Sequence, residues 1–220
     1  MKYIDISHEI ENEMITYKGL PAPLICDYLS REESKSHYDG ETFHIAKIDM
    51  VVNTGTYIDC PFHRYEEGKQ FHEILLERTV NLRGIMVEAP YQESKEIGVT
   101  YFQGLDVTNK AVLVNTGWDS FWRQDQYFED NPYLTEEAAR YLKDKGALMV
   151  GIDSLNIDDT RSKSRPVHST LLAENILIIE HLCNLGQVPK NQEFKVSAAP
   201  PKIKGIGSFP VRVYVELQAN

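Results

Sequence analysis

Two ionisable side chains stand close together in an otherwise neutral stretch of the sequence. Asp59 and His63 are four residues apart, and their neighbours are Thr, Tyr, Cys, Pro and Phe. Gly55 and Pro61 predict turns on either side of Asp59, so we expect a loop after a strand, where catalytic and binding residues are common. A carboxylate and an imidazole can share a metal ion or transfer protons. The same pair also fits an Asp that caps a turn and a His that packs on its neighbours.

Other candidate ligands lie far along the chain. Asp153 and Asp158 follow a predicted strand, His168 precedes a predicted helix, and Glu180 lies inside an apolar run. A buried Glu180 carboxylate would cost several kcal/mol unless it were paired or metal-bound, although Glu180 could also lie at a solvent edge. Asp, His and Glu side chains without thiolates suit Zn²⁺ or Mn²⁺.

No nucleophile or phosphate-binding motif competes with these residues. The sequence contains no Gly-x-Ser-x-Gly, no glycine-rich phosphate loop and no His-Glu-x-x-His. The Cys60 thiol is next to a carboxylate, which opposes formation of a thiolate. The residues alone therefore predict a metal-assisted or general-base hydrolase.

Strands are predicted directly before the polar residues. Residues 43–52 alternate and lead toward Asp59, whereas residues 111–115 and 147–152 are continuously apolar, as in strands buried on both faces. Polar turns follow, with Trp118 after the second strand and Asp153 after the third. Further strands are predicted at 3–6, 83–90 and 210–217.

Two helices are predicted in the second half of the chain. Thr135 is a good N-cap with acidic residues after it, and Gly146 closes that helix. A second helix is predicted from about 169 to 185, with Glu180 inside it. A shorter helical turn is expected within 71–76.

Strands and helices alternate irregularly, and strands gather at both ends. This order predicts an α/β fold with a mixed sheet and outer helices. Residues 11–40 are polar and broken by Gly and Pro, so we expect an extended excursion over the surface. Neither a repeat nor a linker divides the chain, and we expect a single domain over 1–220.

The composition excludes several classes of protein. Hydrophobic residues make up 42% and charged residues 25% of the chain, as in ordinary globular proteins. The net charge of −10 provides no basic patch for nucleic acid or an anionic membrane surface. Three widely spaced cysteines and an N-terminus without a signal sequence favour the cytoplasm.

The chain resembles the cyclase family that includes bacterial kynurenine formamidase and isatin hydrolase. The family signature is His-x-Gly-Thr-His-x-Asp-x-Pro-x-His, and residues 53–63 read Asn-Thr-Gly-Thr-Tyr-Ile-Asp-Cys-Pro-Phe-His. Other parts that carry the resemblance are Ile4-Asp5-Ile6-Ser7-His8, Asn115-Thr116-Gly117-Trp118-Asp119, Gly151-Ile152-Asp153-Ser154 and the pair His168 and Glu180. The resemblance implies a mixed-sheet α/β domain of the swivelling β/β/α type, a small-molecule substrate and a homodimer.

The resemblance also implies roles for individual residues. Asp59, His168 and Glu180 would be metal ligands and His63 would be catalytic. The first two signature histidines, which complete another metal site in the family, correspond here to Asn53 and Tyr57. An amide binds Zn²⁺ weakly, and a phenol with a pKa near 10 must lose its proton to ligate well. We therefore expect one divalent metal, Zn²⁺ or Mn²⁺, with Asn53, Tyr57, Trp118 and Asp153 in the substrate pocket.

Three functional hypotheses remain open at this point. In the first, the protein uses one metal to hydrolyse an amide-type bond, either that of an aryl formamide such as N-formylkynurenine or that of a cyclic amide. In the second, it hydrolyses such a bond without metal. In the third, it has lost activity and binds a small molecule in the same pocket.

Overall fold

The computed structural model describes residues 2–190 and 193–217. Within these residues a nine-stranded sheet has the order β1-β13-β11-β5-β7-β9-β10-β4-β12. Its strands are β1 (Lys2–Asp5), β4 (Tyr57–Asp59), β5 (Leu82–Glu88), β7 (Ala111–Asn115), β9 (Met149–Ile152), β10 (Leu177–Glu180), β11 (Phe194–Ser197), β12 (Ser208–Pro210) and β13 (Tyr214–Leu217). The four central strands β5, β7, β9 and β10 are parallel, and antiparallel strands flank them on both sides. The prediction of a mixed sheet is confirmed.

Short elements surround this sheet. The remaining strands are β2 (Leu24–Leu29), β3 (Ile45–Asp49), β6 (Glu96–Ile97) and β8 (Tyr133–Leu134), and the α-helices are α1 (Arg31–Lys35), α2 (Glu136–Asp144) and α3 (Pro166–Ala173). The 3₁₀ helices are η1 (Pro61–His63), η2 (Phe71–Glu73), η3 (Leu76–Arg78), η4 (Val99–Tyr101), η5 (Trp118–Phe121), η6 (Asp125–Phe128) and η7 (Leu185–Gln187). None of the helices in the described part of the chain is long and apolar enough to span a membrane. The cytoplasmic location stays a prediction.

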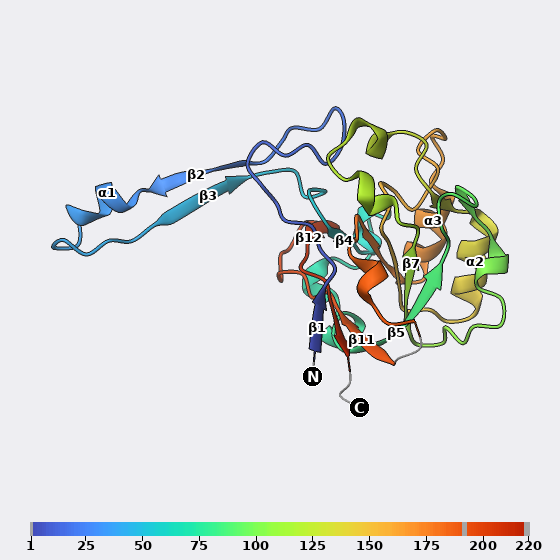
Figure 1. Ribbon diagram of the computed structural model, residues 1–220. Helices are drawn as coiled ribbons and strands as arrows, with labels where there is room; N and C mark the ends of the chain where they lie inside the picture. Colours follow the sequence, from blue (N-terminus) through green and yellow to red (C-terminus); the bar gives the residue numbers. More distant parts are fainter. Residues whose placement is uncertain (1, 191–192, 218–220) are drawn as a thin grey trace.

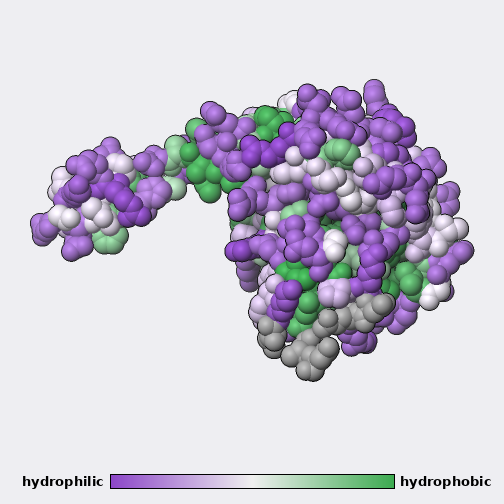
Figure 2. Space-filling view, viewed as in Figure 1, coloured by the Kyte–Doolittle hydropathy of each residue, from purple (hydrophilic) through white to green (hydrophobic). Residues whose placement is uncertain are grey.

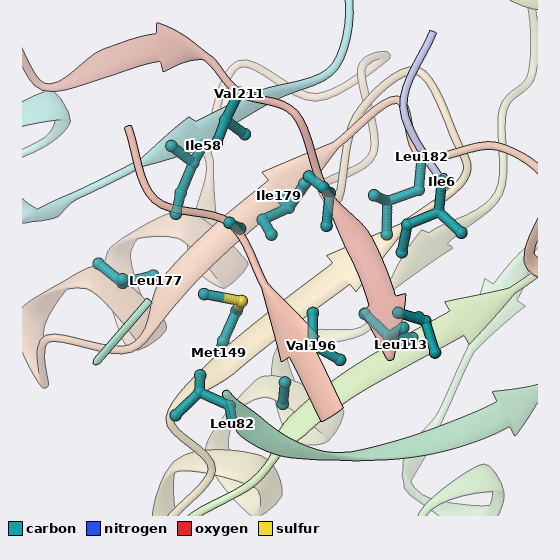
Figure 3. Packing of buried hydrophobic residues seen from close by; sticks show 14 of the residues in the cluster. Ile6, Ile58, Leu82, Leu113, Met149, Leu177, Ile179, Leu182, Val196 and Val211 are labelled. Carbon is teal, nitrogen blue, oxygen red and sulfur yellow. The ribbon is translucent and has the colours of Figure 1, made fainter. Parts of the chain in front are cut away.

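Both faces of the central strands β7, β9 and β10 are buried. Leu113, Met149 and Ile179 point into the apolar cluster shown in Figure 3. The neighbouring residues in the same strands, Val112, Val150 and Ile178, point to the opposite face and pack with α2 and α3. Adjacent residues of a strand point to opposite faces, so burial on both sides requires the continuous apolar runs seen in the sequence.

Helix α2 agrees with its predicted ends. The Thr135 side chain accepts a hydrogen bond from the Ala138 backbone N–H over 3.2 Å and caps the first turn. Gly146 follows the helix with φ +74°, a conformation that favours glycine. Ala138, Ala139 and Leu142 form the buried face of the helix.

The predicted helix over 169–185 is wrong. Helix α3 ends at Ala173, Asn175 turns the chain with φ 57°, and residues 177–180 form strand β10 between β9 and β4. The apolar run has no solvent-facing side because it is buried on both faces of the sheet. Such a run does not distinguish a buried helix from a central strand by periodicity. Glu180 therefore ends a strand.

Two predicted strands also differ in the structure. The strand expected over 43–52 is β3, whose residues are exposed and pair only with β2. The strand expected over 210–217 is divided into β12 and β13, which pair with different partners. Strand β12 ends at Pro210, whose missing N–H cannot continue a ladder.

Strands β2 and β3 and helix α1 form an arm that extends away from the body of the molecule (Figure 1). Residues 11–40, predicted as a surface excursion, include the first half of this arm. Figure 2 shows hydrophobic residues gathered where the arm leaves the body, whereas its tip is mainly hydrophilic. The arm thus has no apolar core of its own.

Candidate metal and catalytic site

Three neighbouring strands bring the site residues to one face of the sheet. In β4, Asp59 is paired with Ile178 of β10 on one side and with Ser208 of β12 on the other. Two residues earlier, Tyr57 is paired with Glu180. Because side chains two residues apart share a face, Tyr57 and Asp59 point away from the core that contains Ile58. Asp59 therefore lies on a strand, where we predicted a loop.

Asp59 is fully buried, with one satisfied oxygen and one unsatisfied oxygen. Its Oδ1 atom accepts a short hydrogen bond from the Ser208 hydroxyl. Its Oδ2 atom has no hydrogen-bond partner among the described residues. A buried carboxylate oxygen without a donor is costly, so this atom indicates a missing positive ligand.

His168 faces that oxygen. Its Nε2 atom lies 3.6 Å from Asp59 Oδ2 and 3.6 Å from Glu180 Oε1. Its Nδ1 atom is 2.6 Å from Asp158 Oδ2, and Asp158 is itself fixed by the backbone N–H groups of Val167 and His168. A carboxylate on the second nitrogen is the usual way to orient a metal-binding imidazole.

Burial and charge set the protonation of His168. Burial opposes a charge on the imidazole, but the carboxylates of Asp158, Asp59 and Glu180 outweigh this effect and raise the pKa of His168 to about 10. Without another cation, a protonated His168 compensates the surrounding carboxylates. A metal ion would replace that proton.

Glu180 closes the other side of this cluster. Its Oε1 atom accepts the Ile157 N–H over 2.7 Å, and its Oε2 atom accepts a short hydrogen bond from the Tyr57 hydroxyl. Burial and the nearby Asp59 carboxylate raise the pKa of Glu180 to about 7, against the charge of His168. Both carboxylate oxygens of Glu180 therefore have protein donors, unlike those of Asp59.

His63 is linked to Asp59 through a serine. The Ser208 Oγ atom lies 2.7 Å from His63 Nδ1 and has only one hydrogen, which it donates to Asp59. His63 Nδ1 must then carry the hydrogen, and its Nε2 atom keeps a lone pair. The ring remains 35% exposed and lines the cavity, and its Nε2 atom has no hydrogen-bond partner among the described residues.

The residues fit a divalent cation by geometry and by chemistry. One donor atom each of Asp59, His63 and His168 lies within 4.8 Å of the others. Two imidazoles and a carboxylate suit Zn²⁺ or Mn²⁺. The unsatisfied Oδ2 atom of Asp59 supplies the negative charge that such an ion needs.

Tyr57 and Asn53 reach the same cavity but present different groups. Burial and the neighbouring charge of Glu180 raise the pKa of Tyr57 well above its ordinary value. Its hydroxyl therefore keeps the proton that it donates to Glu180. Asn53 lines the cavity with a neutral amide.

The cavity above these residues has a volume of about 350 Å³. Tyr57, His63 and His168 line it, as do Tyr17 and Leu20 from the segment before the arm. Arg64 and Arg165 line it as well. A space of this size is at the small end of the range for small-molecule sites, about 300–1,000 Å³.

Trp118 and Asp153 lie outside the cavity, so their predicted place in the substrate pocket is not what the structure shows. Trp118 is buried against Tyr91 and Phe121. Asp153 accepts hydrogen bonds from the Thr116 hydroxyl and the backbone N–H groups of Thr116 and Gly117. Their physical role is to fix the turn after β7.

Several residues of the site were not found from the sequence. Ser208 stands in a glycine-rich segment with no recognisable motif, and its role depends on pairing between β4 and β12. Asp158 was noted only as one of several acids. Asn156 donates to the Tyr17 hydroxyl and to Glu180, and no sequence pattern indicated it.

Comparisons with known proteins agree with this arrangement. The family model described as "Putative cyclase" matches residues 4–159. A kynurenine formamidase from Bacillus anthracis is 27% identical over 218 residues, which are 97% of each chain.

Solved structures share the fold. A potential metal-dependent hydrolase with cyclase activity has a TM-score of 0.79 and 30% identity, covering 97% of this chain and 96% of that chain. An isatin hydrolase bound to the product analogue thioisatinate has a TM-score of 0.81 and 18% identity, covering 97% and 91%, which is a likeness of fold. With the family model matching most of its length, the chain belongs to the cyclase family.

Proposed function

We propose that this protein is a metal-dependent hydrolase of an amide-type bond, with an aryl formamide as the substrate class to test first. The observation that carries the proposal is the unsatisfied Asp59 Oδ2 atom, which lies opposite His168 Nε2 at the base of a cavity. The similarity to a kynurenine formamidase over almost the whole chain supports amide hydrolysis. Opening of a cyclic amide is the alternative within the same chemistry.

Asp59, His168 and Glu180 would hold the metal, with His63 beside them. A bound divalent ion supplies Lewis-acid polarisation of the scissile carbonyl. Glu180 is the third ligand that the family resemblance implies, and its Oε1 atom lies 3.6 Å from His168 Nε2. His63 also has a nitrogen within 4.8 Å of donor atoms of Asp59 and His168, but we assign it to proton transfer. We propose one ion per chain, Zn²⁺ or Mn²⁺, because Asn53 and Tyr57 offer no strong ligand for another.

His63 would act as the general base. Its Nδ1–H donates to Ser208, so its Nε2 atom can take a proton from the attacking water. The Ser208 hydroxyl accepts from His63 Nδ1 and donates to the Asp59 carboxylate. Through this link the negative charge of Asp59 stabilises the imidazolium that forms. The same imidazolium can then protonate the departing amine.

The non-catalytic alternative is a protein that only binds a small molecule in the same cavity. It gives no reason for the hydrogen-bonded path from Asp59 through Ser208 to His63, with one histidine nitrogen left accessible. This path favours an enzyme. A binder would show ligand-dependent thermal stabilisation without turnover on formamides, cyclic imides or lactones.

Replacement His63→Ala tests the proposed base. We expect hydrolysis of an aryl formamide to fall by about 10²–10⁴-fold, the usual contribution of a general base. His37→Ala is the matched control, because His37 is exposed and bonds only locally. Circular dichroism checks that both variants fold. Full turnover by a folded His63→Ala protein would remove His63 from the mechanism.

We also propose that two copies associate through the arm. A two-stranded sheet is marginally stable alone in water, and this one exposes four large apolar side chains, namely Leu24, Tyr28, Ile45 and Ile48. A second copy would cover them. Light scattering should give twice the mass of one chain for the natural protein and a lower mass for a Leu24→Ser, Ile48→Ser variant. A monomeric natural protein would contradict this proposal.

A further inference from the structure

The two carboxylate oxygens of Glu180 differ in their hydrogen bonds. Among the described residues, Oε1 accepts only the Ile157 backbone N–H, over 2.7 Å. Oε2 accepts a short hydrogen bond from the Tyr57 hydroxyl and a second one from the Asn156 amide over 3.3 Å. Glu180 is fully buried, so its carboxylate depends on these donors from the protein. The difference shows which oxygen is free to bind a further positive group.

Tyr17 lies beside Oε2 but does not add a third donor. Its hydroxyl oxygen is 2.5 Å from the Leu155 carbonyl oxygen and 3.2 Å from the Tyr57 hydroxyl. Its distance to Glu180 Oε2 is 3.4 Å. A phenol has one hydrogen, and the shortest of these contacts, to Leu155, takes it. Tyr57 and Asn156 therefore supply the hydrogens that Oε2 accepts.

The Asn156 amide is held in the orientation that this role requires. Its Oδ1 atom accepts the Asp158 backbone N–H over 3.0 Å, which turns the amide nitrogen toward Glu180. That nitrogen has two hydrogens and donates one to Tyr17 over 3.0 Å and the other to Glu180. Tyr17 thus fixes Asn156 from the segment before the arm.

A count of lone pairs leaves one oxygen of Glu180 open. A carboxylate oxygen can accept two hydrogen bonds. Within the described part of the chain, both positions of Oε2 are used, whereas one position of Oε1 is free. Oε1 lies 3.6 Å from His168 Nε2, which lies 3.6 Å from the unsatisfied Oδ2 atom of Asp59. The free positions of three proposed ligands are therefore close together.

We propose that Tyr57 and Asn156 are positioning residues that make Glu180 a metal ligand through Oε1 alone. This inference rests on the proposed metal site. Both residues act through Glu180, because their hydrogens occupy Oε2 and keep the carboxylate from turning. Tyr57 thereby contributes to metal binding although its phenol is not a ligand.

The affinity of the full chain for Zn²⁺ tests this inference. Calorimetric titration of chelator-treated protein should give a Kd about 10–100-fold higher for Tyr57→Phe than for the natural protein, because hydrogen-bond partners of metal ligands contribute about that much. Asn156→Ala should also raise the Kd. Tyr133→Phe is the matched control, because Tyr133 donates to Glu96 over 2.8 Å, away from the cavity, and its Kd should stay unchanged. Circular dichroism checks that the variants fold.

A double-mutant cycle separates a role through Glu180 from a general effect on the fold. Glu180→Gln should weaken Zn²⁺ binding by itself, and in that background Tyr57→Phe should change the Kd by less than about twofold. An unchanged or lower Kd in the single variant Tyr57→Phe would overturn the inference. So would an equal loss with and without the Glu180 carboxylate.

These measurements need no substrate, so they are independent of the proposed activity. If the natural protein binds Zn²⁺ in the expected way but hydrolyses no formamide, the hydrolase proposal fails and the roles of Tyr57 and Asn156 stand. If it hydrolyses a formamide with bound metal but Tyr57→Phe keeps the natural Kd, these roles are wrong and the hydrolase proposal stands. A natural protein that binds neither Zn²⁺ nor Mn²⁺ would contradict the metal site and this inference with it.

Discussion

At the residue scale, the buried polar atoms of Asp59, Glu180 and His168 form the site and also lower the stability of the folded protein. Asp59, Glu180 and His168 are buried and packed together at the base of the cavity, and most of their polar atoms have donors or acceptors in the protein. Asp59 Oδ2 does not. A buried carboxylate oxygen without a donor carries an uncompensated negative charge, which is the physical basis for a cation at this position.

A second buried imidazole makes a prediction about acid stability. The His8 ring stacks on Trp122, with ring centroids 3.9 Å apart, and its Nε2 atom is buried without a partner among the described residues. Burial lowers the pKa of His8 from 6.5 to about 4. Protonation therefore favours the unfolded chain. The contribution of the neutral ring is complete above pH 6.5 and is lost as the pH falls toward 4.

The variant His8→Phe keeps the stacked ring and cannot be protonated. Between pH 6.5 and 4, the natural protein should lose about 3 kcal/mol more unfolding free energy than the variant, at about 1.4 kcal/mol per unit of pKa shift. Urea unfolding of both proteins at several pH values measures this difference. Parallel pH dependence of the two proteins would show that His8 titrates normally in the folded state.

At the scale of elements, the close packing of β12 against η1 positions His63. A Cβ atom on Gly207 would lie 2.1 Å from the His63 backbone N and 2.5 Å from its Cα. Gly207→Ala must therefore displace η1. We expect a loss of about 1–3 kcal/mol in unfolding free energy, typical of overpacking, and a further loss of kcat/KM because His63 moves relative to Ser208.

Gly186→Ala is the matched control for this change, because a Cβ at Gly186 meets nothing within 4 Å. Chemical unfolding and formamide turnover should leave that variant close to the natural protein. If Gly207→Ala behaved in the same way as Gly186→Ala, close packing at Gly207 would not be what positions His63.

The sequence predicted elements well where one local signal decides the structure. Helix α2 was predicted from its Thr135 cap, and strands β7 and β9 from their continuous apolar runs. The prediction failed where pairing with neighbouring strands decides the structure. Residues 175–182 fit a helix or a strand equally, and only their place between β9 and β4 makes β10 a strand.

The residues of the site also divide into those that a local signal predicted and those that depend on strand pairing. Asp59, His63, His168 and Glu180 were predicted, and the structure brings them together although they span more than half of the chain. Ser208 was not predicted, because it reaches these residues only through the pairing of β12 with β4. Trp118 and Asp153 follow strands as predicted, but they fix a separate turn. Position after a strand thus indicated candidate residues but did not indicate which cavity they reach.

The whole molecule combines an acidic body, an arm and the cavity above Asp59 and His168. The arm exposes apolar side chains, which points to a second copy of the chain as its partner. A single domain over 1–220 stays a prediction. The central claim is that one metal ion at Asp59 and His168 supports amide hydrolysis.

Titration of activity with metal tests this claim most directly. The protein is stripped with a chelator and its turnover of an aryl formamide is followed as Zn²⁺ or Mn²⁺ is added in measured equivalents. Given a single strong ligand set, we expect no turnover without metal and a maximum at about one equivalent per chain. Full turnover by the metal-free protein, or a maximum only at two equivalents, would contradict a single catalytic ion at Asp59 and His168.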